Sequence, residues 1–106
     1  MPSSVVCVID TASDRVVATI PVGKKPRGTV VSADGSTAYV SDQPNNQLVM
    51  VDLAAKKQSG TIALGESPEG LDISADGAWL AAAAEESNDV AFVSTATNRK
   101  QLVVRV

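Results

Sequence analysis

The sequence predicts an all-β fold made of small antiparallel sheets, and three observations carry this prediction. The first is a repeat: Pro26–Gly35 (PRGTVVSADG) returns 42 positions later as Pro68–Gly77 (PEGLDISADG), without insertion or deletion. The second is a series of short runs rich in β-branched residues, such as Val5–Ile9. The third is the turn residues between these runs, above all Asp-Gly. Together they predict four short strands in each repeat.

The first two strands of the repeat form a hairpin. The first strand is predicted at Thr29–Ser32 and Leu71–Ser74, and the second at Thr37–Ser41 and Trp79–Ala83. Asp34-Gly35 and Asp76-Gly77 lie between them. Glycine tolerates the positive φ that a tight hairpin turn requires, so these dipeptides predict the turns. A polar loop then leads to the third strand.

The third strand is predicted at Val5–Ile9, Leu48–Val51 and Val90–Val93, and the fourth at Val16–Ile20, Ser59–Leu64 and Gln101–Val106. Two of the third strands, Val5–Ile9 and Leu48–Val51, show no alternation with polar residues. Such runs indicate strands that are buried on both faces. We therefore expect the sheets to stack on one another.

Four-stranded sheets that repeat every 40–45 residues or so around an axis form a β-propeller. A β-sandwich is the alternative, although a sandwich does not require a repeat at constant spacing. The predicted organisation is a half-blade over residues 1–22 and complete blades over 23–64 and 65–106, about two and a half blades. Closed propellers need about four to eight blades, and an open stack exposes an apolar face at each end. We therefore expect an incomplete propeller, completed by further blades of a parent protein or by copies of itself.

The repeat resembles the YVTN-type β-propeller repeats of bacteria and archaea. The residues that carry the resemblance are Val8–Ala12, Val17–Gly23, the Ser-Ala-Asp-Gly turns, the Pro-x-Gly before each first strand, and Ala38–Ser41. The namesake Tyr-Val-Thr-Asn stands as Tyr-Val-Ser-Asp over Tyr39–Asp42 and as four alanines over Ala81–Ala84. The resemblance implies a propeller related to lactonase-like, quinone-associated and haem-d1 proteins, and a periplasmic or cell-surface location. It does not choose a function among them.

Composition excludes several classes of function. The chain is 44% hydrophobic but only 3% aromatic, so its core must be built from aliphatic residues. A formal net charge of −3 argues against binding to nucleic acid. Neither a basic region leading into a long apolar run nor an apolar run that could span a bilayer is present, so we expect no signal peptide and no membrane insertion. Without histidine, the chain cannot by itself supply a Ser–His–Asp or Cys–His arrangement.

Polar side chains gather in the loops expected at the mouth of the propeller channel, where binding residues usually lie. The candidates for a ligand or partner face are Lys24, Lys25, Arg27, Asp42, Gln43, Asn45, Glu66, Glu69, Asp72, Glu85 and Glu86. One interpretation is a site for another protein or a small polar ligand. The other is ordinary solvated loops with ion pairs between blades, since Arg27 aligns with Glu69. We expect no catalytic, cofactor-binding or metal-binding residues here, and therefore a non-catalytic binding or scaffold module. The alternative is part of an enzymatic propeller whose catalytic residues lie in other blades.

The remaining polar residues have structural explanations. Asp10, Asp52 and Ser94 recur at one turn, where such side chains accept hydrogen bonds from turn amides. Asp72, which replaces Val30 of the other repeat, must be hydrogen-bonded or reach water. Cys7 is expected to be buried as a small hydrophobic residue. As the sole cysteine, it cannot form an intramolecular disulfide. Tyr39 and Trp79 are expected to be packing residues with a polar atom.

Overall fold

The structure, a computed structural model, describes residues 4–23 and 26–105, without the side chains of Ser4 and Glu69. In chain order its elements are β1 (Ser4–Asp10), β2 (Arg15–Gly23), β3 (Pro26–Val31), β4 (Thr37–Asp42), η1 (Gln43–Asn45), β5 (Gln47–Asp52), β6 (Lys57–Ala63), β7 (Pro68–Ile73), β8 (Trp79–Ala84), β9 (Asp89–Ser94) and β10 (Arg99–Arg105). Apart from a single 3-10 turn, the strands are the only regular secondary structure among the described residues. They contain no helix long and apolar enough to cross a membrane.

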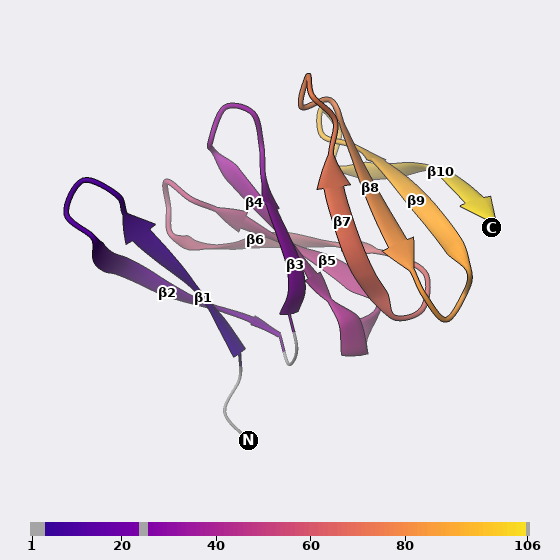
Figure 1. Ribbon diagram of the computed structural model, residues 1–106, viewed down its shortest axis with the longest axis horizontal. Helices are drawn as coiled ribbons and strands as arrows, with labels where there is room; N and C mark the ends of the chain where they lie inside the picture. The colour runs from indigo at the N-terminus through magenta and orange to yellow at the C-terminus, as the bar shows by residue number, and fades with distance from the viewer. Residues whose placement is uncertain (1–3, 24–25, 106) are drawn as a thin grey trace.

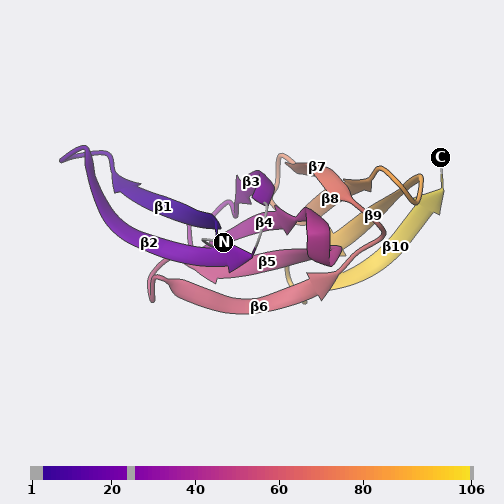
Figure 2. The same cartoon turned by 90° about the horizontal axis from the view of Figure 1, so that it is seen from below.

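The strands form three antiparallel sheets that follow the repeat. The half-blade is the pair β1–β2, the middle blade is β3–β4–β5–β6, and the last blade is β7–β8–β9–β10. Figure 1 shows the three sheets fanned along the long axis of the molecule, with the half-blade at one end and β10 at the other. Figure 2 shows the middle blade edge-on, with β3 at one edge and β6 at the opposite one. The predicted fold class, all-β propeller blades in an incomplete ring, is confirmed.

Strand boundaries differ from the predicted ones where the sheets carry bulges. The first strands begin at Pro26 and Pro68, earlier than predicted, because each proline pairs with the end of the neighbouring strand across a register shift. The last strand likewise begins at Arg99, with a shift between Lys100 and Leu102. A bulge adds a residue to one strand and breaks its alternation, so sequence periodicity does not show it. Val106 lies outside the described residues.

The 42-residue period is also present in the backbone conformation. Gly35 and Gly77 both have φ of 75°, in the two Asp-Gly turns. Asn46 and Asn88, in the loops between second and third strands, both have φ of 55°. The turns between third and fourth strands contain a third set at the same spacing: Asp14 (φ 56°), Lys56 (58°) and Asn98 (55°). Asn and Asp tolerate this left-handed region better than most residues, and Lys56 shows that the turn imposes it.

The core consists of two layers between the sheets. The first lies between the half-blade and the middle blade and contains Ile20, Val22, Ala38, Val40, Val49 and Val51. The second lies between the middle and last blades and contains Tyr39, Leu48, Ile62, Leu80 and Val93. In each layer, the sheet nearer the N-terminus contributes the side chains of one face, and the next sheet contributes the side chains of its opposite face. The predicted burial on both faces is confirmed for Leu48, Val49 and Val51, which are at most 1% exposed, whereas Met50 is partly buried.

Two burial predictions are wrong. Cys7 is exposed, as are Val5 and Ile9, because among the described residues no blade packs against that side of β1. Trp79 is 44% exposed, because its side of β8 also lacks a neighbouring blade. An apolar run predicts burial only if a partner sheet is present, and the sequence pattern does not supply that information. Tyr39, in contrast, is buried as predicted.

Candidate functional site

The loops that lead from fourth to first strands and from second to third strands lie on one face, here called the mouth face. In Figure 1 these loops lie at the lower side of the sheets, opposite the Asp-Gly turns. A recess of about 570 Å³ opens there. Its lining comes from three loops of the middle and last blades: Gln43, Pro44, Asn46, Glu66, Ser67 and Glu86. Side chains far apart in the sequence are therefore brought together at one surface.

Ser67 connects these loops. Gln43 Nε2 donates a hydrogen bond of 2.7 Å to Ser67 Oγ, and the Ser67 amide donates one of 2.9 Å to Asn46 Oδ1. Its carbonyl oxygen in turn accepts a bond of 3.1 Å from the Glu85 amide. The backbone at Ser67 has φ of 59°, which costs energy in a residue other than glycine. The network of hydrogen bonds holds this conformation.

Backbone and hydroxyl groups fix the chain segments that carry the two recess glutamates in the same way. The Glu86 amide donates to the Glu66 carbonyl oxygen at 3.2 Å, so the chain segments that carry both glutamates are joined directly. The Glu66 amide donates to Ser87 Oγ at 3.0 Å. Glu66, Glu85 and Glu86 are all exposed. The recess therefore has walls that are joined by hydrogen bonds and exposed, negatively charged side chains.

Asp42, the last residue of β4, lies beneath the surface of the mouth face and is fully buried. Its Oδ2 accepts hydrogen bonds from Asn45 Nδ2 at 2.7 Å and Gln47 Nε2 at 3.1 Å. Its Oδ1 is buried without a hydrogen-bond partner in the described part of the chain. An unsatisfied buried carboxylate oxygen is costly, because burial removes it from water.

The last blade places its buried carboxylate differently. Asp42 pairs with Gln47 across strands β4 and β5, and the aligned pair in the last blade is Ala84 with Asp89. The carboxylate thus lies at the end of the second strand in the middle blade and at the start of the third strand in the last blade. Asp89 Oδ1 is also buried without a described partner. Its carboxylate lies close to Gly65: a Cβ there would be 2.8 Å from Asp89 Oδ1 and closer still to Ser87 Oγ, so these two side chains would have to shift to admit one.

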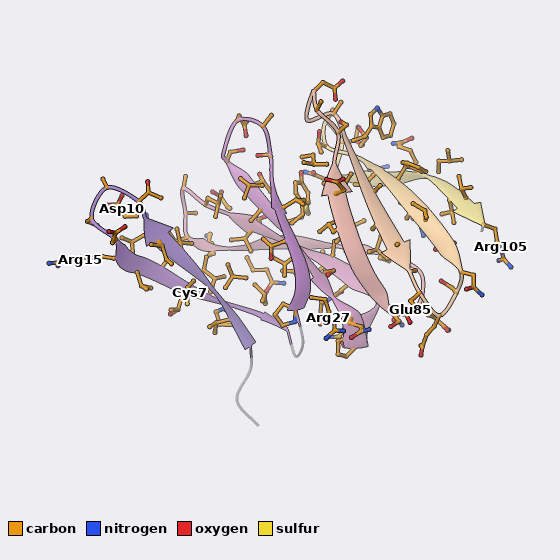
Figure 3. All side chains as sticks on the ribbon, in the orientation of Figure 1. Cys7, Asp10, Arg15, Arg27, Glu85 and Arg105 are labelled. Carbon is orange, nitrogen blue, oxygen red and sulfur yellow. The ribbon has the colours of Figure 1, made fainter. Side chains whose placement is uncertain are left out.

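The structure brings some of the predicted site residues together. Gln43, Glu66 and Glu86 line the recess, and Figure 3 shows Arg27 and Glu85 on the same side of the molecule, away from Asp10. Asn45 binds Asp42 beside the recess, and Asp72 lies on β7, where its Oδ1 accepts a bond of 2.8 Å from the Ile73 amide. Lys24, Lys25 and the side chain of Glu69 lie outside the described residues. Ser67 and Ser87 were not predicted, although the Ser-Pro dipeptide at Ser67 marks a restricted turn in the sequence.

The opposite face carries the hairpin turns, and their predicted structural role is confirmed. Asp34 Oδ1 accepts hydrogen bonds from the hydroxyls of Ser32 and Ser36, each at 2.7 Å, and these bonds lower the pKa of Asp34 to about 2. Asp76 Oδ1 accepts a bond of 2.6 Å from the Ser74 hydroxyl, which together with the Ala78 amide also lowers its pKa. These carboxylates therefore stabilise the turns in which they lie.

In the turns between third and fourth strands, aspartate side chains likewise accept hydrogen bonds from within the turn. The amide of Ala12 donates to Asp10 Oδ1 at 3.1 Å and that of Ala55 to Asp52 Oδ1 at 3.0 Å, as predicted. In the turn that follows Ser94, the bond is a backbone one: the Asn98 amide donates to the Ser94 carbonyl oxygen at 2.7 Å. Across the described residues, no group of three or more Cys, Asp or Glu side chains is arranged to hold a metal ion.

Solved structures share this fold. A chain of hydrazine synthase from Kuenenia stuttgartiensis matches with a TM-score of 0.91 and 24% identity, over 96% of this chain and 30% of that one. The dihydro-heme d1 dehydrogenase NirN, in complex with DHE, matches with a TM-score of 0.82 and 19% identity, over 94% of this chain and 22% of that one. Apo AztD from Citrobacter koseri matches with a TM-score of 0.77 and 12% identity, over 92% of this chain and 29% of that one. These likenesses show the fold alone.

The chain therefore spans less than a third of each of these structures. No curated protein sequence matches it. Residues 6–104, nearly its whole length, match the family described as "Lactonase, 7-bladed beta-propeller". On this match, the chain belongs to the lactonase family of seven-bladed β-propellers.

Proposed function

We propose that this chain is a non-catalytic binding and scaffold module, and that its mouth recess receives a positively charged polar group of a ligand or partner protein. The observation that carries the proposal is the pair of carboxylates, Glu66 and Glu86, at a recess whose walls are fixed by hydrogen bonds between loops. A site whose backbone is already ordered loses little conformational freedom on binding. Two glutamates that line one recess favour a cationic group.

The test is a calorimetric titration with a tri-lysine peptide at low and high salt. The proposal predicts saturable binding that weakens as salt rises, because exposed charges are screened. Glu66→Gln and Glu86→Gln should each weaken the binding several-fold. Asp14→Asn is the matched control, since it removes one negative charge on the opposite face at a position where Asn accepts φ of 56°.

Two results would contradict the proposal. One is the absence of binding heat at low salt. The other is binding that Asp14→Asn weakens as much as Glu66→Gln does, because that would indicate attraction to the overall net charge and not to the recess.

The family match supports a second candidate, a segment of an enzymatic propeller whose catalytic residues belong to other blades. The two candidates differ in what flanking repeats would carry. Further 42-residue repeats with histidine, or with carboxylates and amides clustered at the channel mouth, would favour the enzyme. Calorimetry with calcium is a second test, since a lactonase-like metal site would be built from oxygen ligands. The absence of binding heat with calcium would count against a metal site in this segment.

A further inference from the structure

Two side-chain amides of the mouth recess are held in fixed orientations by the same residue, Ser67. The Ser67 amide can only donate, so Asn46 Oδ1 accepts its bond at 2.9 Å and Asn46 Nδ2 is left as a donor. Gln43 Nε2 donates to Ser67 Oγ at 2.7 Å, which leaves Gln43 Oε1 as an acceptor. Within the described residues, neither Asn46 Nδ2 nor Gln43 Oε1 has a hydrogen-bond partner. The recess therefore offers a ligand one donor and one acceptor.

This donor and this acceptor belong to neighbouring side chains, because both amides are bonded to atoms of Ser67. Gln43 and Asn46 both line the recess, and Asn46 is exposed. In an antiparallel pair of strands, opposite residues exchange an N–H and a C=O in just such an arrangement. An acceptor beside a donor thus fits the C=O and N–H of one residue in an extended peptide.

The acidic side of the recess begins at the next residue. Glu66 precedes Ser67 in the chain, and the Glu86 amide donates to the Glu66 carbonyl oxygen at 3.2 Å. Pro44 is exposed and lines the same recess, where its ring offers an apolar surface to the aliphatic stem of a lysine or arginine. The volume of about 570 Å³ lies within the range of about 300–1,000 Å³ that is usual for ligand sites. The recess can therefore hold more than a single small cation.

The repeat accounts for Asn46 but not for Gln43. Asn46 and Asn88 occupy aligned positions and share a φ of 55°, a conformation that favours asparagine in both loops. The position aligned with Gln43 carries Glu85. A blade does not need an amide there, so the amide at Gln43 is a property of this recess and not of the fold.

We propose that the mouth recess binds an extended basic peptide through both its backbone and its side chain. The backbone N–H and C=O of one peptide residue bond to Gln43 Oε1 and Asn46 Nδ2. The lysine or arginine side chain of the peptide lies toward Glu66 and Glu86. A donor such as Asn46 Nδ2 repels a bare cation and requires an acceptor on the ligand, which a peptide carbonyl supplies. This inference rests on the proposed function, because it names the class of cationic partner that the recess receives.

Two probes of equal charge separate peptide recognition from charge attraction. Acetylated tri-lysine amide and spermidine both carry about three positive charges at neutral pH, but only the first has peptide groups. In calorimetric titrations at one low salt concentration, the peptide should bind about five- to ten-fold more tightly, since hydrogen bonds add to the charge attraction. Equal affinities would overturn the peptide contact and leave the cationic recess standing. Absence of binding by both probes would overturn the proposed function and this inference together.

Asn46→Asp tests the backbone contact directly. Aspartate tolerates a φ of 55° and still accepts the Ser67 amide bond, but it replaces the Nδ2 donor with an acceptor. Its added negative charge acts on both probes alike, so the readout is the ratio of the two affinities, which should fall several-fold. Retained spermidine binding shows that the variant is folded with its recess intact.

Asn88→Asp is the matched control. It adds the same charge at the aligned position, with the same φ of 55°, and Asn88 is not among the residues that line the recess. The ratio of peptide to spermidine affinity should therefore stay at its wild-type value. A wild-type ratio in Asn46→Asp, or an equal fall of the ratio in Asn88→Asp, would overturn the proposed peptide contact.

Discussion

The hydroxyl of Tyr39 donates a hydrogen bond of 2.7 Å to Oδ1 of Asn98. Tyr39 lies in the second strand of the middle blade, and Asn98 lies in a turn of the last blade, where its φ is 55°. The bond thus joins two blades at the end of their shared core layer. It also satisfies the one polar atom of a side chain that is otherwise buried.

Replacing Tyr39 with Phe should destabilise the fold without changing it. The variant keeps the apolar ring but leaves Asn98 Oδ1 without its donor, and the loss of such a bond costs about 0.5–1.5 kcal/mol. Urea unfolding followed by circular dichroism measures the difference. An unchanged unfolding midpoint would show that water replaces the hydroxyl at no cost.

Tyr39 should also ionise at a higher pH than an ordinary tyrosine. Burial, followed by the negative charge of Asp34, raises its pKa above the ordinary value of 10.0. Because the folded state favours the neutral phenol, this contribution to stability is complete below pH 10 and is lost as pH rises through the folded pKa. Tyr39 is the only tyrosine, so phenolate absorbance reports it directly. Ionisation at the same pH in folded and urea-unfolded protein would contradict this prediction.

The lowered pKa of Asp34 predicts that the stability of the fold decreases in acid. Hydrogen bonds from Ser32 and then Ser36 lower its pKa from 3.8 to about 2. Its contribution to stability is therefore present above pH 3.8 and is lost as pH falls toward 2. Thermal unfolding of wild type and Asp34→Asn should differ most above pH 4 and converge near pH 2. A constant difference across that range would mean that the charge of Asp34 does not contribute.

Gly77 and Gly35 form a matched pair. Both have φ of 75°, so alanine at either site should cost about 1–2 kcal/mol through the left-handed backbone. A Cβ at Gly77 would also lie 2.6 Å from Ala33 Cβ of the adjacent blade, whereas a Cβ at Gly35 would meet nothing within 4 Å. Gly77→Ala should therefore destabilise the fold more than Gly35→Ala in urea unfolding. Equal losses would show that the two blades move apart freely at this turn.

The sequence repeat predicts the structural features that depend on neighbouring residues or that recur in each blade. The Asp-Gly turns at Asp34 and Asp76, and the buried strand Leu48–Val51, follow from residue type and spacing, because each depends on a single blade or on neighbours that the chain itself supplies. Cys7 and Trp79 were predicted wrongly for the opposite reason. Their burial depends on blades that the described chain does not place beside them.

The recess was only partly predictable from the sequence. The repeat placed Gln43, Glu66 and Glu86 in loops of one face, as the structure shows. The role of Ser67 depends on a positive φ in a residue other than glycine, and such a conformation comes from tertiary hydrogen bonds that residue type does not reveal.

The most direct test of the proposed binding role is to map the site of tri-lysine binding by amide chemical shifts in an isotope-labelled sample. The account predicts shifts at Glu66, Ser67, Glu85 and Glu86, on the mouth face, and none at the turn around Asp34. Shifts centred on the Asp34 turn, or spread evenly over exposed carboxylates of both faces, would contradict it.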